Sequence, residues 1–294
     1  MKILVFGANG FLGTALLPLL KNNGFEVCSV SRSSEHSNYH VDISRFDDFS
    51  KLPFDYFDTV INCATTLPGG DYLANDYLDK IYKTNILGTQ NICKWIEKQS
   101  SITQIINCST LVVVGKPWPI NLLETDEIYP GGNHVLYSSS KLTQELIFNT
   151  FAKAKKIKVA HLRFSALYSE NMAKSGLIWN LIDQAKSKGV LTLKNADKVS
   201  ADFLHVTDAA RIIVAAINFE IAGIINAASG VEISVMKLAE IIASNFEKGI
   251  KIENTDEENF IEDRAVINVD KLMKIIDLNT FEKFEKVISK MVLS

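Results

Sequence analysis

The sequence predicts an α/β protein built on a doubly wound parallel sheet. Short apolar segments alternate with segments whose apolar residues recur at helical spacing, beginning with KILVF at 2–6 and a helical pattern at 12–22. The strand segments are almost wholly apolar, as strands buried on both faces of a parallel sheet are. A chain of 294 residues can bury the core that this fold needs, as one extended domain or one and a half.

Each expected strand is a short apolar run bounded by turn residues, and each expected helix has a repeating apolar face. In the first half, strands are expected at 2–6, 27–30, 59–62, 104–108 and 158–162, and helices at 12–22, 79–99 and 137–154. After about residue 165 the alternation loosens. There, helices are expected at 177–188, 209–218 and 235–245, and strands at 190–193 and 223–226.

These patterns indicate two units of unequal size. We expect a sheet domain over residues 1–165 and a smaller mixed α/β lobe over residues 166–294, which interleaves with the first and does not fold independently. Ligands of open α/β sheets bind at the carboxyl ends of the strands. A lobe that covers those ends is therefore expected to bind the substrate.

The composition excludes several kinds of partner. A net charge of −3 gives no basic surface for a nucleic acid. The four cysteines lie in apolar stretches without the spacing of metal ligands, which indicates reduced, buried thiols and no metal site. The apolar run before Gly7 is too short for a signal peptide or a membrane span. We therefore expect a cytoplasmic protein that acts on a small molecule, without a membrane or nucleic-acid partner.

The first expected strand runs directly into a glycine-spaced turn, GANGFLG at 7–13. Gly7 allows a tight turn, Gly10 lets backbone N–H groups approach a pyrophosphate, and Gly13 lets the helix pack close to the strand. The helix N-terminus that follows favours an anion. Such glycines can also be purely structural, but their position in the first strand-to-helix turn favours dinucleotide binding.

The end of the second strand is where the adenosine ribose is recognised in such folds. A carboxylate there bonds the ribose 2′-hydroxyl of NAD, whereas an arginine accommodates the 2′-phosphate of NADP. This chain has Ser31 and Arg32 and no carboxylate at that place. A guanidinium binds phosphate well, so we predict NADP, with NAD less favoured; a solvated surface arginine is the alternative.

Tyr137 and Lys141 stand four residues apart in an expected helix, so both side chains lie on one face. A free phenol has a pKa near 10, and a neighbouring ammonium, together with an oxidised nicotinamide, is expected to lower the pKa toward a useful range. The pair Ser109-Thr110 ends an apolar strand upstream, and its hydroxyls could hold a substrate carbonyl or alcohol beside the phenol. The three segments together predict hydride transfer with a tyrosine as acid or base.

At this point the chain resembles the extended short-chain dehydrogenase/reductases, in particular the nucleotide-sugar epimerase, dehydratase and reductase group. The resemblance covers nearly the whole chain and includes GANGFLG at 7–13, INCA at 61–64, TNILGTQNI at 84–92, NCST at 107–110, YSSSK at 137–141 and LRFS at 162–165. Later blocks at 201–217, 224–242 and 262–272 also match. The resemblance implies a Rossmann-type sheet with a small C-terminal substrate lobe.

The resemblance also implies roles for individual residues. Thr110 would orient the substrate oxygen, Tyr137 would be the general acid or base, and Lys141 would hold the nicotinamide ribose. The cofactor is expected to contact Gly7, Asn9, Gly10, Phe11, Leu12, Gly13, Ser31, Arg32, Asp42, Ile43, Cys63, Ala64, Thr65, Asn85, Tyr137, Lys141 and Phe164. The substrate is expected to contact Thr66, Thr110, Trp179 and Arg264. Asn85 would have a structural or water-relay role, and Trp179 could instead simply pack.

Three positions depart from the family pattern. Val114 replaces the tyrosine of the family's VYG segment, Ala166 replaces an asparagine that often contacts substrate, and Ala201 replaces an arginine that often binds phosphate. Two expected contacts to a nucleotide-sugar are therefore missing. The substrate could be bound differently, or could belong to another class.

The favoured interpretation is an NADP-dependent oxidoreductase that reduces a sugar carbonyl, in particular that of a nucleotide-linked 4-keto-6-deoxy sugar. One alternative is a nucleotide-sugar epimerase with a retained cofactor and no net redox change. A dehydratase is disfavoured, because Leu111 and Val112 stand where that group has an acidic pair. The second alternative is a cofactor-binding sensor without catalysis. The helices near 80–98 and 137–153 resemble those that form a dimer interface in this family.

Overall fold

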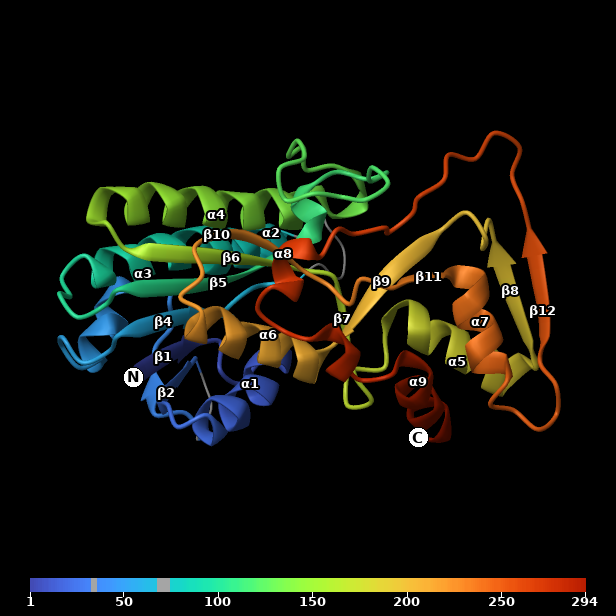
Figure 1. Cartoon of the computed structure of the whole chain (residues 1–294), viewed down its shortest axis with the longest axis horizontal. Helices are drawn as coiled ribbons and strands as arrows, with labels where there is room; N and C mark the ends of the chain where they lie inside the picture. The colour runs from blue at the N-terminus through green and yellow to red at the C-terminus, as the bar shows by residue number, and fades with distance from the viewer. Residues whose placement is uncertain (33–35, 68–74) are drawn as a thin grey trace.

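The computed structural model describes residues 1–32, 36–67 and 75–294. Within these residues the main sheet has seven strands in the order β10-β6-β5-β4-β1-β2-β3, and all neighbouring strands are parallel (Figure 1). The strands are β1 (Lys2–Phe6), β2 (Glu26–Ser31), β3 (Tyr39–His40), β4 (Thr59–Asn62), β5 (Gln104–Thr110), β6 (Lys158–Phe164) and β10 (Gly223–Ala227). The predicted doubly wound parallel sheet is confirmed.

Helices cover both faces of this sheet, α4 on one side and α1 and α6 on the other in Figure 1. On the first side, α3 (Gly88–Ile96) and α4 (Val135–Lys155) pack Ile92, Ile96 and Phe148 on the strands. On the other side, α1 (Phe11–Asn22) and α6 (Val206–Asn218) bury their apolar faces. Burying two apolar faces at once is what requires the strands between them to be apolar throughout.

The helix expected at 79–99 is a composite. It consists of α2 (Asn75–Ile81), a π-helical turn (Tyr82–Leu87) and α3. Asn85 lies in the π-helical turn and is fully buried, and its carbonyl accepts a hydrogen bond of 2.8 Å from the Thr89 hydroxyl. Such wide turns within helices are frequent at functional sites, and periodicity alone does not predict them.

The C-terminal part forms a second group of elements around its own apolar core. A three-stranded sheet has the order β11-β9-β7, and β8 pairs with β12 in parallel. These strands are β7 (Ala166–Tyr168), β8 (Val190–Lys194), β9 (Ser200–His205), β11 (Glu232–Ser234) and β12 (Lys251–Thr255). The helices are α5 (Gly176–Lys188), α7 (Val235–Ala243) and α9 (Phe284–Leu293), whereas α8 (Asp270–Met273) lies beside β10 and packs Leu272 into the core of the main sheet. The lobe core includes Trp179, Ile182, Leu238 and Ile288.

The chain crosses between the two groups more than once. After the lobe has begun with β7 and α5, α6 covers a face of the main sheet and β10 pairs with β6 at the sheet edge. The structure therefore takes part of the main sheet from beyond residue 165. Short 3₁₀ turns lie at Phe46–Lys51, Leu111–Val113, Gly132–His134 and Leu278–Thr280.

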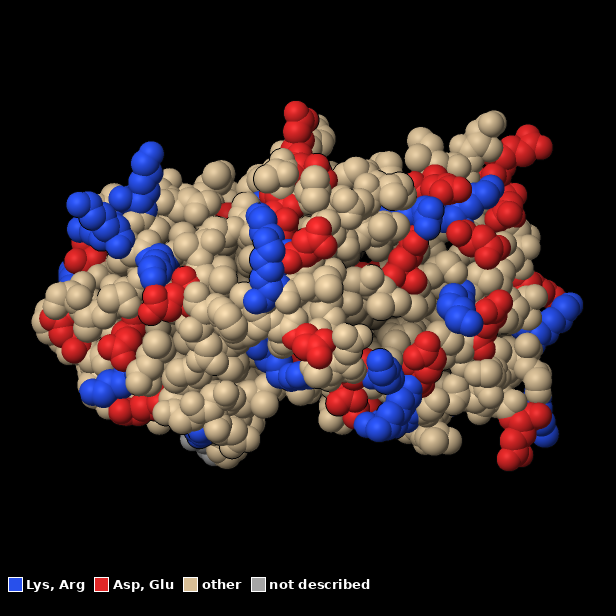
Figure 2. Space-filling model, viewed as in Figure 1, with Lys and Arg blue, Asp and Glu red and all other residues tan. Residues whose placement is uncertain are grey.

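Acidic and basic side chains are interspersed over the face drawn in Figure 2, in keeping with the small net charge. Across the described ranges, none of the helices has both the length and the apolar character of a membrane-crossing segment. The same ranges hold no cluster of three or more His, Cys, Asp and Glu side chains that could bind a metal ion.

Candidate active site

The glycine turn joins β1 to α1 at the carboxyl edge of the main sheet. Gly7 has a φ of +74°, and a Cβ there would lie 2.5 Å from the backbone nitrogen of Ala64. A Cβ on Gly13 would lie 2.4 Å from the carbonyl oxygen of Gly7. Neither position has room for a side chain. Gly10 stands at the N-cap of α1 and, having no side chain, leaves the first N–H groups of the helix to an external anion.

Two cavities open on either side of this turn. The arginine cavity, of about 290 Å³, lies over the ends of β1 and β2 and is lined in part by Arg32. The tyrosine cavity, of about 520 Å³, is lined in part by Tyr137 and Lys141. Both cavities are lined by Gly7, Gly10, Cys63 and Thr65. The two cavities therefore adjoin at the glycine turn and form one cleft, and an extended ligand passing over the turn would reach both.

The structure brings most of the expected cofactor residues to this cleft. The arginine cavity is lined by Gly7, Asn9, Gly10, Ser31, Arg32, Ile43, Cys63, Ala64 and Thr65, and the tyrosine cavity adds Phe11, Leu12, Gly13, Tyr137, Lys141 and Phe164. Thr110 also lines the tyrosine cavity. The sequence reasoning missed other lining residues, among them Val41, Thr84, His134, Ser165 and Met172.

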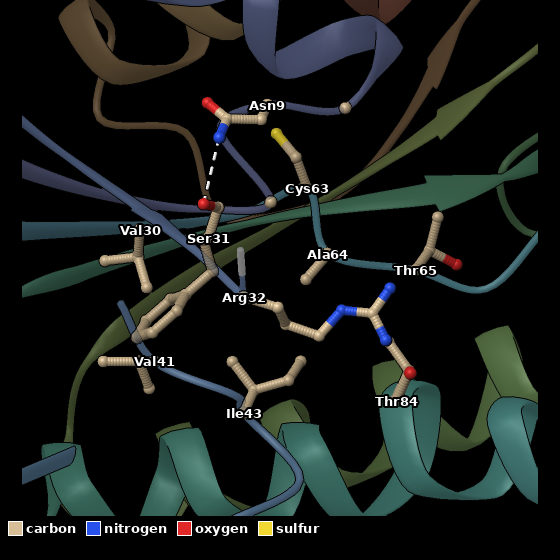
Figure 3. A pocket seen from close by; sticks show the side chains of 13 residues that line it. Asn9, Val30, Ser31, Arg32, Val41, Ile43, Cys63, Ala64, Thr65 and Thr84 are labelled. Carbon is tan, nitrogen blue, oxygen red and sulfur yellow. Dashed lines mark hydrogen bonds between the residues drawn. The ribbon is translucent and has the colours of Figure 1, made fainter. Parts of the chain in front are cut away.

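The arginine cavity has a polar rim at the end of β2. The Asn9 amide donates a hydrogen bond to the Ser31 hydroxyl at 2.9 Å (Figure 3) and another to the Ser37 hydroxyl at 3.0 Å. In Figure 3 the exposed Arg32 side chain is drawn across the cavity, with its guanidinium on the side of Thr65 and Thr84. A guanidinium and hydroxyls at one end of the cleft suit a phosphate or a ribose.

Two of the expected cofactor residues lie outside both cavities. The Asp42 carboxylate accepts hydrogen bonds from the backbone N–H and the hydroxyl of Ser44, at 2.9 and 2.8 Å, so it fixes its own loop. Its neighbour Ile43 does line the arginine cavity. Asn85 is buried beneath the cleft, where its amide oxygen accepts from the backbone N–H of Thr66 at 2.7 Å and its amide nitrogen donates to the Ser140 hydroxyl at 2.9 Å. Asn85 thus joins the loop after β4 to α4.

Tyr137 and Lys141 lie one helical turn apart on α4 and both line the tyrosine cavity. The Lys141 ammonium is buried, with 1% of the residue exposed, and donates to the carbonyl of Cys108 at 2.6 Å and to the amide oxygen of Gln144 at 2.5 Å. Gln144 was not predicted. A lysine followed by an amide residue three positions later on one helix face is the signal that could have identified it.

The pKa of Tyr137 is raised, so the surrounding side chains do not by themselves produce the lowering that was expected from Lys141 together with an oxidised nicotinamide. Burial of the phenol is the main cause, the nearby Tyr77 adds to it, and a hydrogen bond with Thr65 acts in the opposite direction. The ammonium of Lys141 is engaged by Cys108 and Gln144, as described above. The phenol is therefore protonated at neutral pH, which is the state of a general acid.

Burial lowers the pKa of Lys141 to about 8, while the nearby Cys108, Glu145 and Cys63 act in the opposite direction. The lysine is therefore mostly charged at neutral pH and loses its proton within reach of ordinary assay conditions. A buried lysine of this kind destabilises the folded state for as long as it is charged.

Lys141→Met is expected to change how stability depends on pH. The cost of burying the charge is fully present below the folded pKa of about 8 and disappears as pH rises to the unfolded value of 10.5. Across this window the wild-type free energy of unfolding should therefore rise relative to that of the variant, on the order of 3 kcal/mol. Urea unfolding at several pH values measures the difference. Lys153→Met, at an exposed position of α4, should leave the wild-type pH dependence unchanged.

Ser109 and Thr110, adjacent at the end of β5, are used differently. The Ser109 hydroxyl donates to the Glu145 carboxylate at 2.5 Å, and Glu145 forms a fully buried ion pair with Arg163 at 2.8 Å. Thr110 lines the tyrosine cavity, and its hydroxyl makes a long contact of 3.4 Å with the backbone N–H of Val112. Thr110 is thus the hydroxyl that is positioned to meet a ligand.

Three of the expected substrate residues do not line either of the two cavities that form the cleft. Thr66 donates its hydroxyl hydrogen bond to the carbonyl of Lys80 at 3.2 Å. Trp179 is 1% exposed within the lobe core, which fits the packing alternative. Arg264 forms two hydrogen bonds with the Glu232 carboxylate, at 2.8 and 2.6 Å. A direct role in binding substrate would require Arg264 to leave Glu232.

A third space, the alanine cavity, lies between β5 and the lobe and has a volume of about 180 Å³. It is lined by Ala166 and Ala201, the two alanines that depart from the family pattern, and by Thr110. Lys116 and Trp118 also line it, with the ammonium 4.7 Å from the ring centroid. The tyrosine cavity and the alanine cavity therefore adjoin at Thr110. Where the family pattern has an asparagine and an arginine, this pocket has Ala166 and Ala201.

The family model of the NAD dependent epimerase/dehydratase family matches residues 3–228 of the chain. Among curated proteins, a Methanocaldococcus jannaschii protein named as a candidate UDP-glucose 4-epimerase is 27% identical over 252 residues, which are 82% of this chain and 81% of that protein.

Solved structures share the fold over the whole chain. UDP-N-acetylglucosamine 4-epimerase from Bacillus cereus superposes with a TM-score of 0.79 at 24% identity, covering 100% of this chain and 96% of the other. The complex of Thermus thermophilus UDP-glucose 4-epimerase with NAD superposes with a TM-score of 0.77 at 18% identity, covering 99% and 98%. These similarities establish the fold and, with the family model, the type of enzyme.

Proposed function

The chain belongs to the NAD dependent epimerase/dehydratase family, and from this premise we propose that it oxidises and reduces one carbon of a nucleotide-linked sugar. The observation that supports this best is one continuous cleft that passes from the glycine turn to Thr110, Tyr137 and Lys141. A dinucleotide site alone would also suit a sensor. A buried phenol with a threonine hydroxyl and an ammonium on the same cavity suits proton transfer during redox chemistry.

In this proposal each residue has a defined task. The glycine turn and the N-terminus of α1 bind the pyrophosphate, and the bound nicotinamide supplies a hydride acceptor or donor. Tyr137 gives its proton to the substrate oxygen when a carbonyl is reduced and takes one when an alcohol is oxidised. Thr110 orients that oxygen, and Lys141 binds the ribose with an ammonium that Cys108 and Gln144 already hold in place.

We propose an epimerase-type cycle, in which oxidation and reduction follow each other on a retained cofactor, as the first candidate. The names of the relatives support this alternative over the predicted reduction of a 4-keto-6-deoxy sugar. The predicted NADP-dependent reductase remains the second candidate, because Arg32 stands where a carboxylate would select NAD. In the alanine cavity, the Trp118 ring could replace a missing contact by stacking. The Lys116 ammonium could bind a phosphate there, but it would have to leave Asp263, with which it pairs at 2.8 Å.

The experiment that tests this function is a substrate panel. The protein is incubated with UDP-hexoses and nucleotide-linked 4-keto-6-deoxy sugars, with NAD or NADPH, while nicotinamide absorbance and sugar products are followed. A changed sugar with no net change in nicotinamide supports the epimerase. NADPH consumption matched by a new alcohol supports the reductase. If neither the sugar nor the nicotinamide changes with any member of the panel, the proposal is wrong.

Arg32→Ala tests the cofactor preference. If the guanidinium binds a 2′-phosphate, its loss should weaken NADPH binding by about 10- to 100-fold, because hydrogen bonds to a charged group contribute roughly 1.5–3 kcal/mol. NADH binding should change little. Calorimetric titration of both cofactors measures the ratio, and Arg45→Ala, which removes an exposed charge that does not line the cavity, is the control. If the affinities for NADPH and NADH fell equally, Arg32 would not select NADP.

We also propose a homodimer formed through the composite helix of α2 and α3, near residues 80–98, and through α4. Apolar side chains of these neighbouring helices are exposed, among them Leu78 at 49% and Leu146 at 56%. Leu146→Lys is expected to shift the protein to monomer, because a charge would be buried in the interface. Analytical ultracentrifugation measures the state. Phe219→Lys, at an exposed apolar position after α6, should have no effect. A monomeric wild type would exclude the dimer.

A further inference from the structure

Two cysteine thiols meet on the floor of the cleft. Cys63 follows β4 directly and Cys108 lies in β5, and the two are neighbours across the parallel pair because Asn62 is in register with Asn107. Their Sγ atoms are 3.4 Å apart. Both residues line the tyrosine cavity, and Cys63 also lines the arginine cavity. The thiol pair is thus reached from the cleft and is not sealed within the core.

The general spacing of parallel strands suits a disulfide between these two positions. Neighbouring parallel strands lie roughly 4.8 Å apart, which is within the Cα separation of about 4.4–6.8 Å that disulfides span. A covalent bond requires the sulfurs to approach from 3.4 Å to about 2.0 Å, which small side-chain rotations can supply without separating the strands.

We propose that Cys63 and Cys108 are a reversible oxidation site, at which a peroxide converts the two thiols into a disulfide. The Cys63 thiolate attacks one peroxide oxygen, the O–O bond breaks, and a sulfenic acid and hydroxide form. The hydroxide takes up the proton that the Cys63 thiol had released and becomes water. The Cys108 sulfur then displaces the sulfenic oxygen as a second water, and the S–S bond forms. The two thiols lose two electrons and two protons in total, and hydrogen peroxide is reduced to two molecules of water. Cys63 reacts first because it is the more open of the two and lines both cavities.

The surroundings determine how readily the pair reacts. The contact with Cys108 and burial hold the pKa of Cys63 well above the usual range, while the Lys141 ammonium acts to lower it. Oxidation at neutral pH should therefore be slow but measurable, since only the thiolate attacks. The other two thiols differ in setting: Cys93 is buried in α3, and Cys28 lies in β2 and lines neither of the two cavities that form the cleft.

A disulfide between Cys63 and Cys108 would alter the part of the cleft that positions Lys141. The carbonyl of Cys108 accepts the hydrogen bond that holds the Lys141 ammonium, and Cys63 flanks both halves of the cleft. The oxidised protein should therefore lose activity until a dithiol reductant restores the thiols. A bound dinucleotide would cover Cys63 and slow the oxidation, a part of the inference that rests on the proposed function.

The test uses the full chain with hydrogen peroxide, in the presence and absence of saturating NAD. Free thiols are then alkylated, and linked peptides are identified by mass spectrometry before and after dithiothreitol. We expect a peptide pair joined through Cys63 and Cys108, removed by dithiothreitol, with activity returning in parallel. Cys28→Ser should form the same bond at the same rate, and Cys108→Ser should form none.

The outcomes separate the two proposals. A disulfide that forms equally fast with and without NAD overturns the shielding and counts against the cofactor site, while the oxidation site is upheld by the linked peptides. Irreversible sulfinic acid at Cys63 in place of a disulfide, or no linked peptide at all in the wild type, overturns the oxidation site and leaves the proposed function intact. The wild-type peptide map decides this even if a serine variant does not fold.

Discussion

Tyr137→Phe is expected to reduce turnover by about 10²- to 10⁴-fold, the usual contribution of a positioned acid or base. The substitution removes only the hydroxyl from a side chain that is 8% exposed, so packing on α4 is preserved. Affinity for the nicotinamide cofactor should remain within a few-fold of the wild type, because the glycine turn and Lys141 are unchanged. Single-turnover rates and a cofactor titration on the same preparation measure both quantities.

The same variant distinguishes an enzyme from a sensor. Tyr129→Phe, at a position that is 79% exposed, removes an equivalent hydroxyl outside both cavities that form the cleft and should keep wild-type turnover. If Tyr137→Phe retained full activity with the substrate found in the panel, the acid–base role would be wrong. Loss of cofactor binding together with turnover would instead indicate a structural role for the phenol.

Gly13→Ala is expected to have the largest effect on the folded protein. The added Cβ would lie 2.4 Å from the carbonyl oxygen of Gly7 and 2.5 Å from that of Ala8, so backbone must move on both sides of the turn. Overpacking of this kind destabilises by about 1–3 kcal/mol or more. Since the displaced atoms form the turn that would bind the pyrophosphate, cofactor affinity should fall as well. Thermal unfolding with and without NAD measures the two effects.

A matched substitution is available elsewhere in the chain. Gly249 has no heavy atom within 4 Å of an added Cβ and does not have a positive φ, so Gly249→Ala should leave stability and cofactor affinity nearly unchanged. If Gly13→Ala bound NAD as the wild type does, the glycine turn would not be the pyrophosphate site, whatever its effect on unfolding.

The first half of the fold could be predicted because its elements are long and strongly patterned. β1, β4 and β5 are apolar runs bounded by turn residues, and the predicted positions of all three are confirmed to within two residues. The short strands of the lobe are harder to predict from the sequence. Strands β7 and β11 have only three residues each, too few for a pattern to emerge, and their pairing with β9 is set by tertiary contacts.

In the candidate site, too, the residues set by local sequence spacing could be predicted, and those set by tertiary contacts could not. Residues of the glycine turn and of the Tyr137–Lys141 pair could be found because their spacing follows from local geometry. Gln144, which holds the Lys141 ammonium, has only a weak signal: it shares a helix face with Lys141, but an amide in a helix is usually solvated. Arg264 illustrates the converse: its block matches the family, but its partner Glu232 is 32 residues away and only the fold brings the two together.

The return of the chain to the main sheet bears on how the protein is made on the ribosome. Strand β10, at residues 223–227, is the last to be added to the sheet, although β6 ends at residue 164. Until β10 emerges, β6 is an open edge that can pair with other extended segments, and the sheet face that α6 covers is bare. Nascent chains that stop between these points should therefore depend on chaperones, and release should follow synthesis of β10 rather than of the nucleotide-binding motifs.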